Sequence, residues 1–273
     1  MKVKDYFLTQ EEFELKVDPT HGMLCTQPIP SDLGKYYESE KYISHTDGKK
    51  SVFEKLYQLA KSANLKAKYK VVERHATGKK ILDYGCGVGD FLAYMKQKGF
   101  EVEGFEPNAT ALEIARRKLG NLVTNESIVQ RKQQYDVITL WHVLEHIPNR
   151  DEIFQSLIDH LTPDGILVVA LPNHNSYDAK FYGKYWAAYD VPRHLWHFDP
   201  ESMKRYVSFF GMKIEIIYPQ YFDSLYVGIL SEKYQKNQFA FLRGVYLGLI
   251  SNYKAKKTKQ FSSLIYMIKK DQK

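Results

Sequence analysis

From Lys79 onward, short apolar runs alternate with stretches of helical periodicity, and this alternation constrains the fold most strongly. Such runs, rich in Val, Ile and Leu, are typical of strands buried on both faces of a parallel sheet. Because strand and helix alternate through short connections, the pattern predicts an α/β fold of βαβ units. The expected strands are 80–84, 101–105, 121–124, 135–141, 165–171, 212–218 and 262–268.

Helix-capping residues mark the starts of three intervening helices. Asn108 is expected to cap one helix, and Asn149 with Glu152 forms an N-x-x-E variant of the capping box before another. Asp199 precedes a third helix, with Pro200 at its first position.

The chain is expected to form one domain that follows a short irregular segment. Residues 1–50 are rich in Tyr and turn-forming Pro, so we expect an irregular lid there. Residues 51–273 would form the domain, beginning with a helix over 51–76 that breaks near Asn64. A helical insertion is expected over 221–259, before the last strand.

Composition excludes several classes of protein. The 21 Tyr, 15 Phe and 3 Trp supply ample core material, so disorder is not expected. No run approaches the ~18–20 apolar residues that span a bilayer, and the first residues lack the apolar segment of a secretory signal. Cys25 and Cys86 are the only cysteines, too few for a disulfide framework or a cysteine-rich zinc site. A cytoplasmic protein is expected.

A glycine-rich turn joins the first of these strands to the first helix. Gly85, Gly87 and Gly89 allow the backbone to turn tightly and to approach a ligand, and the helix N-terminus behind them favours polar groups. A dinucleotide-binding fingerprint would need Gly or Ala at position 90, which is Asp90. A pyrophosphate-containing cofactor is therefore disfavoured.

Two carboxylates accompany this turn. Asp83 lies two positions before Gly85 and can hold a cationic amino group through a charge-assisted hydrogen bond. Glu106 follows the second strand, where a carboxylate can bind both hydroxyls of a ribose. Together they describe a ligand with a ribose and an amine but no pyrophosphate, and S-adenosylmethionine (SAM) fits this description.

Four segments resemble the class I SAM-dependent methyltransferases, in that family's order and spacing. The segments are ILDYGCGVGDF (81–91), GFEPNATALEIAR (104–116), YDVITLWHVLEHIPN (135–149) and LTPDGILVVALPN (161–173). The LEH-x-P pattern is similar to that of bacterial small-molecule and ubiquinone-type O-methyltransferases. The resemblance implies a three-layer αβα, Rossmann-like, doubly wound sheet of seven strands with the last one antiparallel. It also implies methyl transfer from SAM, with S-adenosylhomocysteine (SAH) as product.

The resemblance further implies a cofactor site, carried over here residue by residue. Asp83, Gly85 and Gly87 would line the methionine end of the cofactor. Glu106 would bind the ribose and Pro107 would flank the adenine. The complete set expected to contact the cofactor is Asp83, Tyr84, Gly85, Cys86, Gly87, Gly89, Phe105, Glu106, Pro107, Asn125, Trp141 and His142.

Two parts of this set complete the expected site. Trp141 and His142 would close the cofactor's open side. Asn125 stands at the usual adenine-binding position, although segment 124–127 lacks the Asp that the family commonly has there.

Histidines are concentrated where the acceptor is expected. A general base is needed only for weak nucleophiles such as hydroxyls, and histidine is the usual base near neutral pH. His142 and His146 follow the fourth strand, at the sheet edge where open α/β folds bind ligands. His194 lies in the connection 172–199, which is long enough to form a lid or binding loop and is rich in aromatic residues. The candidate catalytic residues are therefore His194, His146 and His142, with His197 the weaker alternative.

No metal is expected. Glu145 lies between His142 and His146, but the sequence shows no further converging ligand and methyl transfer needs no metal. Glu145 or His146 is expected instead to be structural and to orient the loop. Segment 26–37 is similar to one that follows a zinc-ribbon-like segment in many look-alikes, but no Cys pair precedes it here. Its tyrosines and His45 are expected to cover the cofactor as an N-terminal lid.

The net charge of +7 is unevenly distributed. Residues 231–273 hold ten Lys or Arg and two acidic residues, so the rest of the chain is almost neutral and nucleic acid is an unlikely partner. Segment 241–259 combines an apolar stretch with a cationic end. It is expected either to be a solvated turn after a core helix, or to dock an anionic acceptor or a membrane surface.

The acceptor itself is expected to be a small molecule or a glycan or lipid precursor, methylated on oxygen or nitrogen. Two alternatives stay open, a SAM-binding module without catalysis and an RNA methyltransferase. A nicotinamide-dependent oxidoreductase is disfavoured by Asp90 and by the lack of a downstream Tyr-x-x-x-Lys pattern.

Overall fold

A seven-stranded mixed sheet forms the centre of the protein, which a computed structural model describes over residues 1–37 and 52–271. The strands are β4 (Lys80–Tyr84), β5 (Glu101–Phe105), β6 (Val123–Thr124), β7 (Tyr135–Trp141), β8 (Leu161–Pro172), β10 (Met212–Pro219) and β11 (Ser263–Lys270). Their order is β10-β11-β8-β7-β4-β5-β6. Strand β11 is antiparallel to both of its neighbours, while β8, β7, β4, β5 and β6 run parallel. The expected fold class is confirmed.

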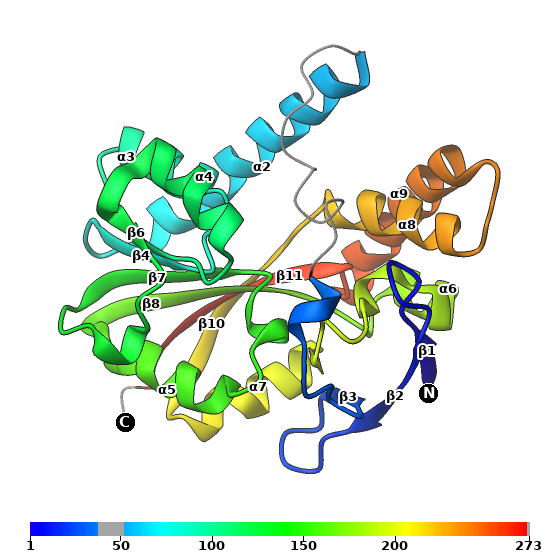
Figure 1. The fold of residues 1–273 in the computed structure, drawn as a ribbon, viewed down its shortest axis with the longest axis horizontal. Coiled ribbons are helices and arrows are strands. Elements are labelled where there is room, and N and C mark those ends of the chain that lie inside the picture. The colour runs from blue at the N-terminus through cyan, green and yellow to red at the C-terminus, as the bar shows by residue number, and fades with distance from the viewer. Residues whose placement is uncertain (38–51, 272–273) are drawn as a thin grey trace.

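Helices cover both faces of this sheet (Figure 1). Helices α2 (Val52–His75), α3 (Asp90–Gln97) and α4 (Ala109–Leu119) cover one face, and α5 (Arg150–Asp159) and α7 (Pro200–Phe209) cover the other. Successive strand residues alternate between the two hydrophobic clusters, because side chains of a strand point alternately to opposite faces. In β4, for example, Ile81 packs in the cluster of α2 to α4, and Leu82 in that of α5 and α7. The expected break of α2 near Asn64 is wrong, since the helix is continuous.

The capping predictions were right for two helices and wrong for one. The side chain of Asn108 accepts a hydrogen bond of 3.0 Å from the backbone N–H three residues on. Asp199 caps α7 in the same way at 2.8 Å, with Pro200 at the first position. Asn149 does precede α5, but its side-chain amide donates to Glu152 at 2.9 Å and caps no backbone group. The two side chains pair because the amide of Asn149 is a hydrogen-bond donor and the carboxylate of Glu152 is an acceptor.

The N-terminal segment corrects the expectation of an irregular lid. Strands β1 (Lys2–Lys4), β2 (Glu12–Val17), β3 (Leu24–Gln27) and β9 (Trp196–His197) form a second, antiparallel sheet. Phe13 and Leu15 are buried while Glu12 and Glu14 are exposed, the period of two that a half-buried strand requires. The sheet also needs β9, which comes from the distant connection 172–199. Tyr42 and His45 of the expected lid lie outside the described residues.

The helical insertion before the last strand is confirmed. It consists of α8 (Asp223–Tyr234) and α9 (Ala240–Thr258), which pack against each other. A Cβ added to Gly244 would lie 2.5 Å from the backbone of Ile229, so the two helix backbones are in close contact. Within the described ranges, no helix is long and apolar enough to cross a membrane.

The long connection 172–199 is folded tightly onto the second sheet and onto the insertion. It contains α6 (Tyr177–Tyr182) and then two short helical turns before β9. The carboxylate of Asp178 is buried and accepts hydrogen bonds from Trp186 Nε1 at 2.8 Å, Ser251 at 2.6 Å and Ser262 at 2.7 Å. These bonds fix the connection to α9 and to the start of β11.

Candidate active site

A first cavity of about 300 Å³, here called the glycine cavity, lies at the carboxyl ends of β4 and β7. Its lining includes Asn64, Leu65, Lys68, Asp83, Gly85, Cys86, Gly87, Val88, Asp90, Phe91 and Trp141. Asp83 is 2% exposed and accepts a hydrogen bond of 2.6 Å from Thr139 Oγ1. Burial raises the pKa of Asp83 to about 7, although the bond from Thr139 and the charge of Lys68 oppose the shift. A cationic ligand group would shift this carboxyl back to its ionised form.

The glycines of the turn serve different purposes. Gly87 has a φ of +55°, and an added Cβ would meet nothing within 4 Å, so its backbone faces open space in the cavity. Gly85 has a φ of +79°, but an added Cβ would lie 2.5 Å from Val143, so this position also requires glycine for packing. Gly89 precedes α3 with a φ of +77° and packs against α4.

Glu106 is buried beside the turn and fixes its shape. Its two carboxylate oxygens accept hydrogen bonds of 2.8 Å from the backbone N–H groups of Gly87 and Asn108. Burial raises the pKa of Glu106, while these two bonds oppose the rise. Each carboxylate oxygen has a second acceptor position, so the arrangement leaves capacity for the two ribose hydroxyls expected here.

The remaining expected cofactor residues are more dispersed. Tyr84 and Phe105 stack on each other with ring centroids 4.4 Å apart, and neither lines the glycine cavity. Pro107 and Asn125 are exposed and also lie outside its lining. Cys86 does line it, and burial raises the pKa of its thiol far above the ordinary value, so the group stays protonated.

Lys68 on α2 is a site residue that the sequence reasoning missed. Its Nζ lies 4.4 Å from the ring centroid of Trp141. Burial lowers the pKa of Lys68, and the nearby charges of Asp83 and Asp223 oppose that shift. Its position in the sequence could have indicated this role. Lys68 lies one helical turn before the buried Val72, so it is a cation on the apolar face of the helix, where a charged side chain is unusual.

A second cavity of about 460 Å³, here called the lid cavity, lies between the connection 172–199 and α8. Its lining comprises Phe7, His142, His146, Pro172, Ala187, Ala188, Asp190, His194, Asp223, Tyr226, Val227, Leu230, Tyr234 and Ser263. This lining is mostly apolar and contains no Lys or Arg of the described part of the chain. Because His142 follows Trp141 directly, the end of β7 borders both cavities.

His142 is held between two carboxylates on the wall of the lid cavity. Its Nε2 lies 3.1 Å from Asp223 Oδ2, and its Nδ1 lies 3.4 Å from Glu145 Oε1. Burial alone would lower the pKa of His142, but these two acids outweigh it and raise the pKa to about 10. A histidine already protonated at neutral pH cannot accept a proton, so this geometry disfavours His142 as a general base.

His146 and His194 meet in the lid cavity with their rings edge to face and 4.5 Å between centroids. His146 Nδ1 lies 3.0 Å from the carbonyl oxygen of Arg193, and His194 Nδ1 lies 2.9 Å from that of Ala188. Since a carbonyl only accepts, each Nδ1 carries a proton, and in the neutral form of each ring the lone pair is on Nε2. His194 Nε2 lies 4.0 Å from Asp190 Oδ2. Burial, together with the nearby His194, lowers the pKa of His146 to about 4, so that ring is neutral.

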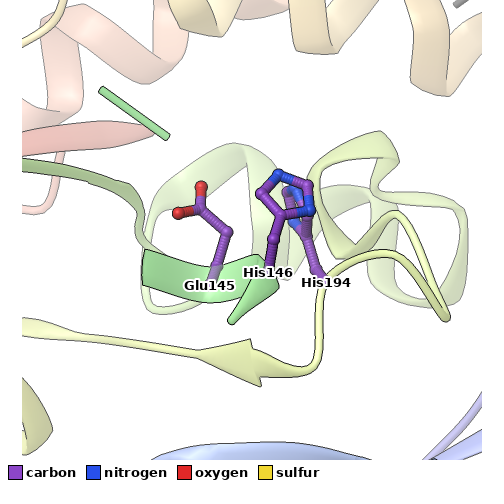
Figure 2. Close-up of side chains that lie close together, drawn as sticks. All are labelled: Glu145, His146 and His194. Carbon is purple, nitrogen blue, oxygen red and sulfur yellow. The ribbon is translucent and has the colours of Figure 1, made fainter. Parts of the chain in front are cut away.

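Glu145 and His146 come from one short helical turn, and His194 reaches them from the neighbouring connection (Figure 2). Tyr37 is close by, with its hydroxyl 3.1 Å from His146 Nδ1. The N-terminal segment therefore contacts a residue that lines the lid cavity. His197 does not line the lid cavity, and its Nε2 is bonded to Thr26 Oγ1 at 2.9 Å.

Parts of this sequence are shared with known proteins. A model of the methyltransferase domain family matches residues 56–215. The ubiquinone biosynthesis O-methyltransferase of Shewanella halifaxensis (strain HAW-EB4) is 34% identical over 107 residues, which are 36% of this chain and 45% of the relative. That of Actinobacillus pleuropneumoniae serotype 5b (strain L20) is 35% identical over 109 residues, 35% of this chain and 47% of the relative. The chain thus spans about half the length of the curated relatives it matches.

Solved structures show the same fold at low sequence identity. Magnesium protoporphyrin IX methyltransferase from Synechocystis PCC 6803, crystallised with SAH, aligns with a TM-score of 0.55 and 15% identity over 86% of this chain and 97% of that one. A putative sarcosine dimethylglycine methyltransferase from Galdieria sulphuraria aligns with a TM-score of 0.52 and 12% identity over 78% and 86%.

Proposed function

Because the chain belongs to the methyltransferase domain family, among the class I SAM-dependent methyltransferases, we propose that it methylates a hydroxyl of a small-molecule acceptor. The observation that carries the proposal is the shared border of the two cavities at Trp141 and His142. A cofactor in the glycine cavity and an acceptor in the lid cavity would meet there. In-line methyl transfer requires the acceptor atom to be aligned with the methyl group of the cofactor. This alignment supplies much of the rate enhancement, and the arrangement of the two cavities would provide it.

The residues of the glycine cavity, with Glu106 beside its glycine turn, fit SAM. Asp83 would hold its amino group, Glu106 its ribose hydroxyls, and the backbone at Gly87 leaves room for close approach. The ammonium of Lys68 on the same cavity wall would face the carboxylate of the methionine moiety. When bound, SAM supplies a methyl group on a positively charged sulfur.

His194, with His146 beside it, is proposed to take the proton of the acceptor hydroxyl. The unprotonated Nε2 atoms supply the lone pair that this role needs. As the acceptor oxygen forms its bond to the methyl carbon, the bond between sulfur and that carbon breaks and its electron pair stays on sulfur. The hydroxyl proton passes to imidazole Nε2, and the products are the methyl ether and neutral SAH.

The lining of the lid cavity favours an acceptor with an apolar or aromatic body. Val227 and Leu230 supply apolar surface, and Phe7 and Tyr234 supply aromatic surface. The curated relatives are named O-methyltransferases, which agrees with a hydroxyl acceptor. An apolar cavity without Lys or Arg in the described lining gives little support to an RNA acceptor, which would need cationic groups for its phosphates.

Helix α9 is proposed to contact an anionic membrane surface. Leu242, Tyr246, Leu249 and Tyr253 recur at helical spacing along its solvent side and are all more than half exposed. Basic residues lie at the end of this helix, at positions 254, 256, 257 and 259. Apolar residues on one face with flanking cations are typical of helices that lie in a membrane interface. Contact with a membrane would place the enzyme near apolar acceptors.

Incubation with methyl-labelled SAM and fractionated cell extract tests the proposed function. We expect label in a small organic product, and loss of labelling in His194→Ala with SAM affinity changed no more than a few-fold. His75→Ala serves as the control, because His75 contacts Tyr218 away from both cavities. Unchanged turnover in His194→Ala would remove His194 from the mechanism. SAM binding without any labelled product would favour a binding module.

A further inference from the structure

Glu145, His146 and His194 form a cluster whose ligand atoms all lie within 4.8 Å of one another (Figure 2). We propose that this cluster binds a divalent transition-metal cation. Two imidazoles and one carboxylate form a known type of three-residue metal site that leaves coordination positions open. The sequence showed no third ligand near the LEH segment, because His194 comes from a different loop.

Both histidines make the hydrogen bond that metal-binding histidines usually make through the other ring nitrogen. Backbone carbonyls fix each Nδ1–H, at 3.0 Å for His146 and 2.9 Å for His194. In the neutral form of each ring the lone pair is therefore on Nε2, where a cation can bind it. Metal-binding histidines usually donate their other N–H to a carbonyl or carboxylate in this way.

Glu145 supplies the independent observation that a cation belongs here. The residue is 1% exposed, and neither carboxylate oxygen has a hydrogen-bond partner among the described residues. Among the described residues its ion-pair contact is with His142 Nδ1 at 3.4 Å, and Asp223 shares the charge of that ring at the shorter distance of 3.1 Å. A buried carboxylate without hydrogen bonds is costly, and a coordinated cation would remove that cost.

The open coordination positions would face the lid cavity, because His146 and His194 both line it. With a cation bound, the two Nε2 lone pairs are occupied and cannot also accept the hydroxyl proton. The cation would then replace the histidine base: an acceptor hydroxyl could take an open position, where the cation lowers its pKa and the proton leaves to solvent. This role rests on the proposed function, since it assumes a hydroxyl acceptor in that cavity. Cation binding itself does not depend on it.

Titration of the chelator-treated protein with Co²⁺ tests the site directly, because its visible absorption reports the coordination by nitrogen and oxygen ligands. We expect one Co²⁺ per chain, displaced by Zn²⁺. Glu145→Gln, His146→Asn and His194→Asn should each weaken binding by about a hundredfold or more, since each removes one of three protein ligands. His75→Asn is the control and should bind Co²⁺ as the wild type does.

Thermal melting and SAH binding identify variants that fail to fold, and only folded variants are compared. Absence of Co²⁺ absorption in the wild type, or its retention in folded Glu145→Gln, would overturn the proposal. Methyl transfer by a protein that binds no Co²⁺ would overturn the metal site and leave the proposed function intact. Co²⁺ bound through these residues without methyl transfer would support the site and overturn the proposed function instead.

Discussion

Thr139 Oγ1 donates a hydrogen bond of 2.6 Å to Asp83 Oδ1 at the base of the glycine cavity. Burial nevertheless raises the pKa of Asp83 from 3.8 to about 7. Between these two values the folded protein keeps a proton that the unfolded chain releases, so this group makes the cofactor-free protein less stable as the pH rises. Binding of a cationic amine requires the ionised carboxylate and therefore releases that proton.

The affinity for SAM is expected to depend on pH through Asp83. Below pH 7 the dissociation constant should rise by up to about tenfold per pH unit, and above pH 7 it should level off. Asp83→Asn should bind weakly with a flat profile, and Thr139→Val should shift the transition to higher pH. Calorimetric titration across this pH range measures all three. Glu113→Gln on the exposed face of α4 is the control, and an unchanged profile in Asp83→Asn would contradict the assignment.

Gly87 is expected to be required for cofactor binding rather than for folding. Gly87→Ala and Gly99→Ala both place a side chain at positive φ, +55° and +82°, and in both the added Cβ meets nothing within 4 Å. Each should cost about 1 kcal/mol of unfolding free energy through backbone strain. Only Gly87→Ala should weaken SAM binding, because Gly99 lies outside the glycine cavity. Denaturant unfolding and SAM titration separate the two effects, and equal SAM affinities would contradict the prediction.

The buried ion pair between Arg193 and Asp5 is expected to hold the second sheet onto the connection 172–199. Arg193 Nη2 lies 2.9 Å from Asp5 Oδ1, and both side chains are almost fully buried. Asp5→Ala should lower the free energy of unfolding by about 3–5 kcal/mol, because it leaves part of the Arg193 charge without its partner. Denaturant unfolding measures this loss.

An exposed pair on the same sheet gives the control. Glu14 and Lys16 lie 3.4 Å apart with half of each side chain exposed, so Glu14→Ala should change stability by less than about 1 kcal/mol.

The stabilisation by Asp5 is expected to depend on pH. Burial raises the pKa of Asp5, but Arg193 and backbone N–H groups outweigh it and hold the pKa below its usual value. The contribution of Asp5 is therefore present above the usual carboxyl range and is lost as the pH falls below it. A constant difference down to strongly acid pH would contradict this account.

Much of the central fold could be predicted because its elements are defined by local patterns. Apolar runs marked the strands of the main sheet, and the caps at Asn108 and Asp199 depend only on neighbouring residues. The second sheet was missed because β3 pairs with β9, far away in the sequence. The residues of β2 alternate visibly, but nothing local indicates the partner that completes the sheet.

The difference between local patterns and partners distant in the sequence also explains how much of the candidate site could be predicted. Asp83, Gly87 and Trp141 could be placed together because parallel strands end at one edge of the sheet. The meeting of His146 with His194 could be expected only in outline, since an irregular connection sets the position of His194. The charges that surround His142 were not predictable, because Asp223 comes from the helical insertion.

Binding of α9 to anionic vesicles is the most direct test of the proposed membrane contact. The wild-type protein should sediment with phosphatidylcholine vesicles that contain phosphatidylglycerol, and much less with phosphatidylcholine alone. Replacing Lys254, Lys256, Lys257 and Lys259 with Gln should abolish most of this binding, since each basic residue near such a surface contributes roughly 1 kcal/mol. High salt should have a similar effect on the wild type.

The apolar part of this contact needs a matched pair of variants. Leu242 is 68% exposed on α9, and Phe209 is 67% exposed at the end of α7, a different helix. Leu242→Asn combined with Leu249→Asn should reduce vesicle binding several-fold, because insertion buries apolar area. Phe209→Asn should leave it unchanged. Equal losses in both would indicate non-specific adhesion, and vesicle binding unaffected by the Lys and Leu variants would show that α9 is not the contact.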